Sequence, residues 1–161
     1  MRKTIIAALL ASVLMPLNAQ DYTRTVGNVV TEITFYSPEI VRVTKYQASD
    51  AFGKTDPKVV VTMTPQSVNP TLLEGSKTDT LLTDKVMVTC TKQTGVLGFF
   101  RPDGTALIKE RTKATFTKRT SHTIDPYTVS QSFKLSTGEA IYGFGQVQDG
   151  SLNHRNKSYR S

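Results

Sequence analysis

Apolar and polar side chains alternate with a period of two along much of the chain, which is the pattern of half-buried β-strands. In residues 29–36, for example, Ile33 and Phe35 share one face and Thr34 and Tyr36 the other. Further strands are predicted at residues 39–46, 59–63, 80–82, 85–91, 96–100, 105–110, 114–118, 127–135 and 140–144. Because short strands recur about every 8–12 residues without a helical period between them, we expect an all-β fold, an antiparallel sandwich or barrel.

Glycine, proline and short polar residues mark the connections between these strands. Ser37-Pro38 separates the first two strands, residues 47–57 form a polar loop, and residues 65–75 form an irregular connection. Residues 101–104, Arg-Pro-Asp-Gly, are a typical turn, because proline presets φ while aspartate and glycine tolerate the other positions. We therefore expect the strand after this turn to pair back as a hairpin.

The first 19 residues have the features of a secretory signal. Arg2 and Lys3 precede the apolar run 5–14, and small residues lead to a cleavage site after Ala19. The apolar run is shorter than the roughly 20 residues that span a bilayer, and no later segment is long enough. We expect an exported protein, periplasmic or extracellular, without a membrane span.

The composition predicts one domain and excludes several kinds of metal site. The 161 residues fit a single sandwich over residues 20–150, followed by a polar loop over 151–161. The single cysteine, Cys90, excludes an internal disulfide and a multi-cysteine metal site, and it is expected to be a core residue. With only His122 and His154 as further soft ligands, no metal and no cofactor are predicted.

The charged residues do not form a recognisable catalytic set. The 13 acidic residues are scattered, and Glu32, Glu39 and Glu110 lie in or beside strands, where structural or solvent-facing carboxylates are common. Ser121 and His122 are adjacent and so do not form a nucleophile pair. The formal net charge of +7 raises nucleic acid as a partner. Aromatic residues are not interleaved with the basic ones, so no nucleic-acid binding is expected.

The most informative segment is residues 138–146, Gly-Glu-Ala-Ile-Tyr-Gly-Phe-Gly-Gln. Its two neighbouring glycines at the end of a predicted strand permit positive φ or a close backbone approach. The segment lacks the third glycine and the helix of a dinucleotide site. It continues into residues 150–155, Gly-Ser-Leu-Asn-His-Arg.

Residues 141–146 and 150–155 together resemble the motif near the end of the N-terminal region of glycoside hydrolase family 31. The early strand pair, residues 35–43, is similar to that family as well. The other segments that agree are residues 92–95, 103–104, 109–110 and 131–133. The resemblance covers about residues 26–157 and is strongest for exported bacterial members that act on α-xylosides or α-glucosides.

The resemblance implies a galactose-mutarotase-like β-sandwich that packs against a (β/α)8 barrel, and an incomplete sandwich in this chain. In the family the barrel supplies an Asp nucleophile and an Asp general acid, which act as a retaining pair. Neither residue can be carried onto this sequence, so the chain should be inactive alone. It also implies a loop directed toward the active site.

We expect the loop to carry the substrate-rim candidates Asp149, Asn153 and Arg155. The alternative is that these side chains hold the loop or the domain interface. Tyr142, Gly143, Gly145 and Gln146 are expected to be the structural part of the motif.

Some positions depart from the family pattern. Asn156 stands where glycine is expected, and residues 158–161 do not continue the pattern, which leaves foreign sequence from a truncation or frameshift as one explanation. Two other functions also remain open, a stand-alone carbohydrate-binding sandwich and a non-enzymatic surface adhesion module. The sequence does not fix the α-glycoside, the oligomeric state, or whether this product is stable.

Overall fold

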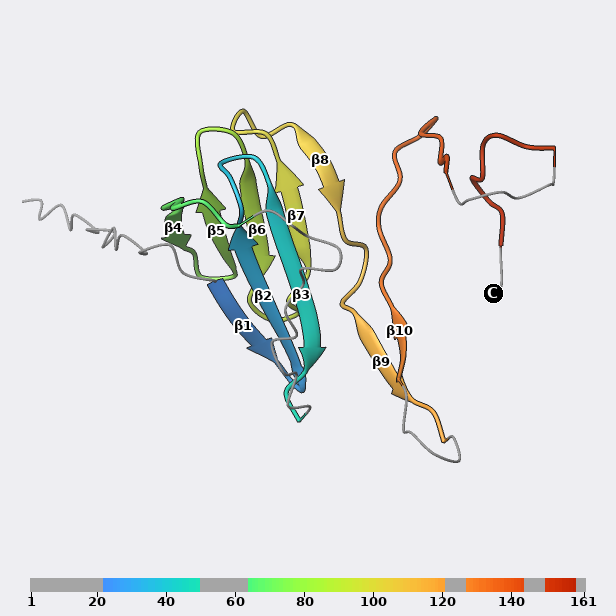
Figure 1. The fold of residues 1–161 in the computed structure, drawn as a ribbon, viewed down its shortest axis with the longest axis horizontal. Helices are drawn as coiled ribbons and strands as arrows, with labels where there is room; N and C mark the ends of the chain where they lie inside the picture. Colours follow the sequence, from blue (N-terminus) through green and yellow to red (C-terminus); the bar gives the residue numbers. More distant parts are fainter. Residues whose placement is uncertain (1–21, 50–63, 121–126, 144–149, 159–161) are drawn as a thin grey trace, which may run out of the picture.

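The alternating runs form strands in a computed structural model of the chain, and the described residues contain no helix. The residues that the structure describes are 22–49, 64–120, 127–143 and 150–158. Within them, ten strands form three antiparallel sheets (Figure 1). The predicted all-β antiparallel fold is therefore confirmed. The strand predicted at 59–63 and the signal in residues 1–19 lie outside the described residues.

The first sheet has three strands in chain order, β1 (Tyr22–Val26), β2 (Val29–Phe35) and β3 (Val41–Gln47). β2 and β3 confirm the predicted strand pair. β1 is not among the predicted strands, because Tyr22 is its single buried residue and its apolar pattern is weak. Gly27 lies in the tight turn from β1 to β2 with φ of 60°, a conformation that glycine adopts without strain.

The second sheet has five strands, also in chain order. They are β4 (Thr71–Glu74), β5 (Thr78–Leu82), β6 (Met87–Thr91), β7 (Leu97–Phe100) and β8 (Ala106–Lys109). β4 corrects the sequence prediction, since residues 71–74 fall in the segment predicted to be irregular. Only Leu72 of this edge strand is half-buried, and the other three residues are exposed, so β4 leaves little pattern in the sequence.

The predicted turn at residues 101–104 joins β7 to β8 as a hairpin. The Arg101 amide donates to the Thr105 carbonyl at 2.8 Å, and Gly104 has φ of 86°. The Asp103 carboxylate accepts the Thr105 amide at 2.8 Å. This hydrogen bond holds the pKa of the Asp103 carboxyl below its ordinary value.

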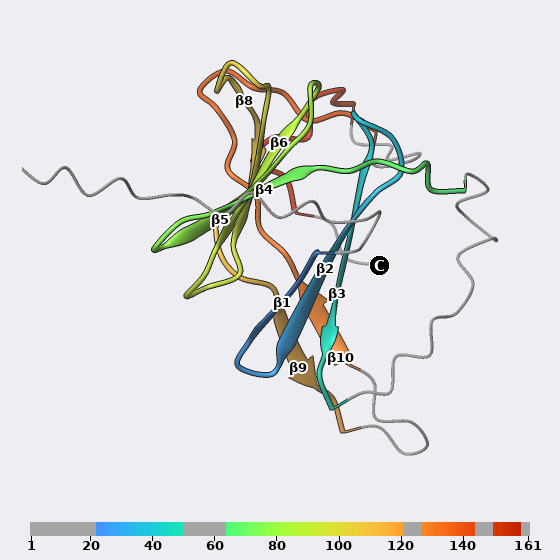
Figure 2. The same cartoon turned by 90° about the vertical axis from the view of Figure 1, so that its left-hand side faces the viewer.

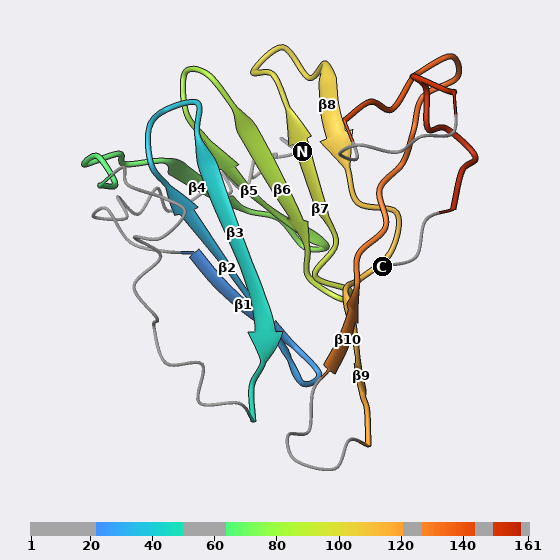
Figure 3. The ribbon, with the colours of Figure 1, turned by 45° about the vertical axis from the view of Figure 1, so that its right-hand side comes forward.

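The two larger sheets lie as two layers with the core between them (Figure 3). Ile33 from the three-stranded sheet packs with Leu81, Val88 and Leu97 from the five-stranded sheet, and all four are at most 1% exposed. Cys90 is fully buried in the same cluster, which confirms it as a core residue. Burial raises the pKa of its thiol.

A buried carboxylate also joins the two layers. Asp79 on β5 is 2% exposed and accepts the Tyr22 hydroxyl of β1 at 2.8 Å. Lys92 Nζ lies 3.0 Å from Asp79 Oδ1, and the Arg24 guanidinium lies 3.8 Å from Oδ2. Burial and the hydrogen bond to Asp79 raise the pKa of the Tyr22 hydroxyl well above its ordinary value. This cluster fixes β1 to the second sheet.

The third sheet is a two-stranded ribbon of β9 (Thr115–Lys118) and β10 (Tyr127–Ser130), which projects beyond the end of the five-stranded sheet (Figures 1 and 2). β9 confirms the strand predicted at 114–118. The strand predicted at 127–135 is wrong beyond Ser130, where only an isolated bridge between Glu110 and Phe133 remains.

Residues 140–143 of the strand predicted at 140–144 are not a strand either. Ala140 and Ile141 are both half-buried and Tyr142 and Gly143 are both exposed, so burial does not alternate here as it does in a strand. Residue 144 lies outside the described residues.

Candidate functional site: the glycine-motif loop and the polar junction

The glycine-motif loop consists of residues 136–143 and 150–158, and it lies on the β8 side of the sandwich, away from β4 (Figure 3). Its two parts run side by side. The His154 amide donates to the Ile141 carbonyl at 2.8 Å, and the Ile141 amide donates to the Asn153 side-chain oxygen at 3.1 Å. The two segments of the predicted motif are thus joined by hydrogen bonds.

The side chains of Asn153 and Arg155 bind the backbone of this loop. The Asn153 side-chain oxygen also accepts the Arg155 amide at 3.0 Å. Arg155 Nη1 donates to the carbonyls of Ser136 and Glu139 at 2.9 and 2.6 Å. These contacts give both residues a part in holding the loop, which is the alternative that the sequence left open. Their contact with a sugar remains a prediction, and Asp149 lies outside the described residues.

The structural residues of the motif are partly described. Tyr142 is 68% exposed at the loop surface, and Gly143 has φ of 91°. A non-glycine residue at that φ is strained, so the motif needs glycine here for its backbone conformation. Gly145 and Gln146 lie outside the described residues.

Two residues near the end of the loop were not assigned a role from sequence. Asn156 has φ of 63°, and asparagine is one of the few other residues that tolerate this region, which explains how it can replace the expected glycine. His154 is 8% exposed, although it belongs to a segment that reads as an open polar loop. No local pattern in the sequence distinguishes this buried histidine from its polar neighbours.

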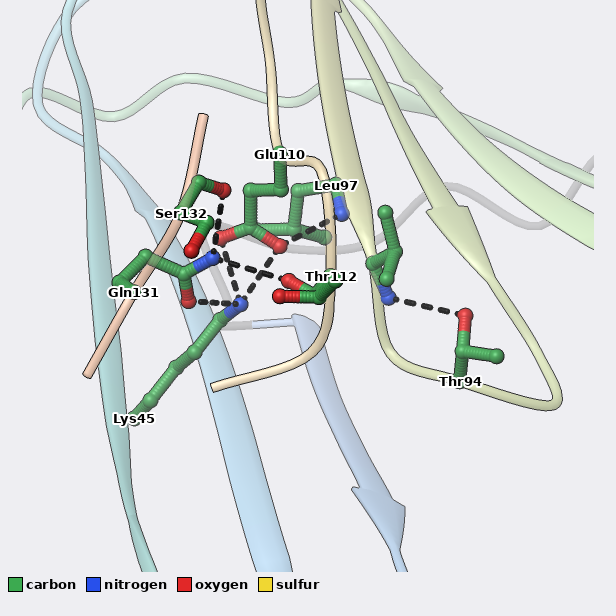
Figure 4. Close-up of polar contacts among 8 residues, drawn as sticks. Lys45, Thr94, Leu97, Glu110, Thr112, Gln131 and Ser132 are labelled. Atoms are coloured by element: carbon green, nitrogen blue, oxygen red, sulfur yellow. Dashed lines mark hydrogen bonds and ion pairs between the residues drawn. The ribbon is translucent and has the colours of Figure 1, made fainter. Parts of the chain in front are cut away.

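A largely buried polar cluster connects the three sheets. We call Lys45, Glu110 and Gln131 the polar junction (Figure 4). Lys45 Nζ on β3 lies 2.5 and 2.7 Å from the two carboxylate oxygens of Glu110 and 3.3 Å from the Gln131 side-chain oxygen. The Lys45 and Glu110 side chains are 10% and 5% exposed, so water screens this ion pair little.

Glu110 also binds the backbone of β7. Its Oε2 accepts the Leu97 amide at 2.8 Å, and its own amide donates to the Leu97 carbonyl at 2.9 Å. The carboxylate that the sequence assigns to a structural or solvent-facing role is therefore structural and buried. Lys45 and Gln131 carry no sequence signal for this contact, because Lys45 and Glu110 lie 65 residues apart.

Exposed apolar side chains occur near both features. We call the set on β8, on β10 and on the segment that follows β10 the apolar flank. It consists of Leu107, Ile108, Val129, Phe133 and Leu135, which are 42–59% exposed. Exposed apolar side chains can contact another protein surface, and the consecutive residues Leu107 and Ile108 present them on both faces of β8.

The described residues contain neither a cluster of three or more histidine, cysteine or acidic side chains that could hold a metal ion, nor a helix able to cross a membrane. Within these residues, the two ionisable side chains of the junction, Lys45 and Glu110, form an ion pair with each other.

Comparison with known proteins assigns the family. The model of the glycosyl hydrolase 31 N-terminal galactose mutarotase-like domain matches residues 30–161. Comparison with curated protein sequences gives no match. Among solved structures, the chain is similar to the crystal structure of the family 31 alpha-xylosidase from Xanthomonas citri.

The likeness to the alpha-xylosidase concerns the fold. The TM-score is 0.76 at 21% identity, and the alignment covers 89% of this chain but 16% of the alpha-xylosidase chain. This chain thus corresponds to a small part of that enzyme. Together with the match over residues 30–161, the sandwich shows that the chain belongs to the glycosyl hydrolase 31 N-terminal galactose mutarotase-like domain family.

Proposed function

We propose that this chain is the N-terminal β-sandwich of an exported retaining α-glycosidase, and that it supports a (β/α)8 barrel that carries the catalytic Asp pair. The observation that carries the proposal is the family match over residues 30–161. The signal-like residues 1–19 support export. In a retaining enzyme the two carboxyl groups lie about 5–5.5 Å apart, and the barrel supplies both.

The apolar flank is the surface that the barrel covers in this proposal. Val129 is 59% exposed and Leu107 is 52% exposed, so both side chains are open to a partner. The glycine-motif loop lies on the same side of the sandwich (Figure 3). A barrel on this side would contact the flank and the loop together, and the loop would then border the substrate.

An α-xyloside or an α-glucoside is the proposed substrate. The alpha-xylosidase from Xanthomonas citri, to which the fold is similar, supports the xyloside. Asp149, Asn153 and Arg155 remain candidates for the substrate rim, although Asn153 and Arg155 also hold the loop through the backbone contacts described above. Arg155 has several N–H donors, and two of its contacts use Nη1, so its other nitrogen atoms can still donate.

Two steps test the proposal. First, the coding DNA beyond codon 161 is read in all three frames, and a barrel with an Asp pair is expected. Second, turnover of p-nitrophenyl α-xyloside and α-glucoside is measured for this chain alone and for the chain joined to that barrel. We expect no turnover by the chain alone and hydrolysis of one substrate by the joined protein. Turnover by the chain alone would contradict the proposal.

Calorimetry distinguishes a stand-alone carbohydrate-binding sandwich from a domain that only supports a barrel. The chain is titrated with xylo- and gluco-oligosaccharides in the absence of any barrel. A scaffold gives no heat of binding, because the rim is incomplete without the barrel. Saturable heat from the isolated chain would favour the stand-alone binding module instead.

A further inference from the structure

The β9–β10 ribbon buries few of its own side chains. Of its eight residues, only Phe116 and Tyr127 are half-buried, and the other six are exposed. The two rings contact each other edge to face, with centroids 6.4 Å apart. An isolated two-stranded ribbon is marginally stable in water, so the ribbon needs support from the sandwich.

Support is concentrated at the base of the ribbon, where its two ends meet the sandwich. The ends are joined to each other by backbone hydrogen bonds, from the Arg111 amide to the Ser132 carbonyl and from the Lys134 amide to the Lys109 carbonyl, both 2.8 Å. These bonds hold the ends together, but they do not fix the direction in which the ribbon leaves the sandwich.

The polar junction supplies that direction, because its contacts reach β3, β7 and the opposite end of the ribbon (Figure 4). Glu110, at the start of the ribbon, binds Lys45 of β3 and the Leu97 amide of β7. Gln131, at the end of the ribbon, accepts from Lys45 and donates to the Thr112 carbonyl at 3.0 Å. Three fixed points, on two sheets and on the opposite end of the ribbon, define an orientation where a single contact would allow rotation.

We propose that the polar junction orients the β9–β10 ribbon and the chain that follows it, and that Glu110 and Gln131 are positioning residues for the glycine-motif loop. The role in an active site rests on the proposed function. The orientation of the ribbon does not, because it follows from contacts within this chain.

The test measures amide hydrogen exchange of the full chain, residue by residue, in three variants. Gln131→Ala removes the Gln131 contacts and leaves the Lys45–Glu110 pair intact. Glu110→Gln leaves the Lys45 ammonium without its counter-charge and is expected to affect the sandwich as well. The matched control is Glu32→Gln, since Glu32 accepts the Tyr46 hydroxyl at 2.8 Å on the face of the sheet opposite to Lys45, whose cross-strand partner is Thr31.

In Gln131→Ala we expect exchange in β9 and β10 to become about tenfold faster, while β2, β5 and β6 keep their wild-type rates, because the lost hydrogen bonds release the ribbon locally. Glu32→Gln should leave the ribbon unchanged. Unchanged ribbon exchange in Gln131→Ala would overturn the inference, as would an equal increase throughout the chain, which would indicate lost stability rather than lost orientation. Should Glu110→Gln not fold, Gln131→Ala still decides.

The same measurement separates this inference from the proposed function. An absent barrel or an inactive joined protein would overturn the glycosidase proposal and leave the exchange result standing. In a joined protein that is active, Gln131→Ala is expected to raise KM several-fold at similar kcat, because the loop is displaced while the catalytic groups of the barrel are not. A similar KM would show that the ribbon does not position the loop for substrate.

Discussion

Replacement of Asp79 by asparagine should destabilise the chain by removing a buried charge that connects the two layers. The side chain is 3% exposed and faces two cations and the Tyr22 hydroxyl. A hydrogen bond to a charged acceptor contributes about 1.5–3 kcal/mol. The Lys92 and Arg24 side chains are 27% and 34% exposed, so each ion pair adds at most about 1 kcal/mol.

Asparagine keeps one acceptor for Tyr22 but directs an NH2 group toward donors that it cannot pair with. We therefore expect Asp79→Asn to lower the free energy of unfolding by about 2 kcal/mol, measured by urea denaturation of the full chain. For a chain of this size, Tm should fall by about 4–8 °C.

Asp84→Asn is the matched control for this prediction. Asp84 also has a lysine partner, Lys85 at 3.6 Å, but its side chain is 70% exposed. Its replacement should change the free energy of unfolding by less than about 0.5 kcal/mol. Equal stability of the two variants would refute the reasoning, because it would mean that desolvation of Asp79 cancels all of its contacts.

Three further outcomes are expected. The pKa of Tyr22 is raised in the folded chain, whereas the unfolded chain loses this proton above about pH 10, so the free energy of unfolding should decline as the pH rises beyond 10. The decline should be less steep in Tyr22→Phe, although the raised pKa of the Cys90 thiol leaves part of it. Equal pH dependence of the two proteins in urea denaturation would contradict the assignment to Tyr22. Gly98→Ala should cost about 1–3 kcal/mol, since a Cβ there would lie 2.8 Å from a ring carbon of Phe100, and an unchanged Tm would show that the ring moves aside freely. The exposed apolar flank should make the isolated chain self-associate, and Val129→Lys should reduce this association in light scattering without lowering the free energy of unfolding. A decrease of more than about 1 kcal/mol would mean that Val129 is covered in the free chain.

The sequence was sufficient for strands that bury alternate residues. In β6, Val88 and Cys90 are buried between half-buried neighbours, so the period of two is visible in the residues themselves. β1 and β4 were missed because the core contact of each strand is a single residue, Tyr22 or Leu72, which shows little in the sequence, while pairing with β2 or β5 holds the rest of the strand. Tyr22 is also fixed by its hydrogen bond to Asp79.

The candidate site was predictable only where a motif is local. Gly143 and its neighbours could be singled out because the residues of the motif follow one another in the sequence, at positions 138–146. The Lys45–Glu110 pair joins residues 65 positions apart, and nothing near either residue indicates the other. Residues 140–143 of the strand predicted at 140–144 are not a strand, because Ile141 forms its backbone hydrogen bond with His154 within the loop and not with a sheet strand.

The most direct test of the scaffold role is association with the barrel through the apolar flank. The chain and the barrel are produced together as separate polypeptides, and their co-elution in size-exclusion chromatography is compared for the wild-type chain and for Leu107→Lys with Phe133→Lys. We expect the wild-type chain to co-elute with the barrel and the lysine variant to elute apart from it, while both chains melt at similar temperatures. Separate elution of the wild-type chain, or co-elution of the lysine variant, would contradict a barrel-facing role for this surface.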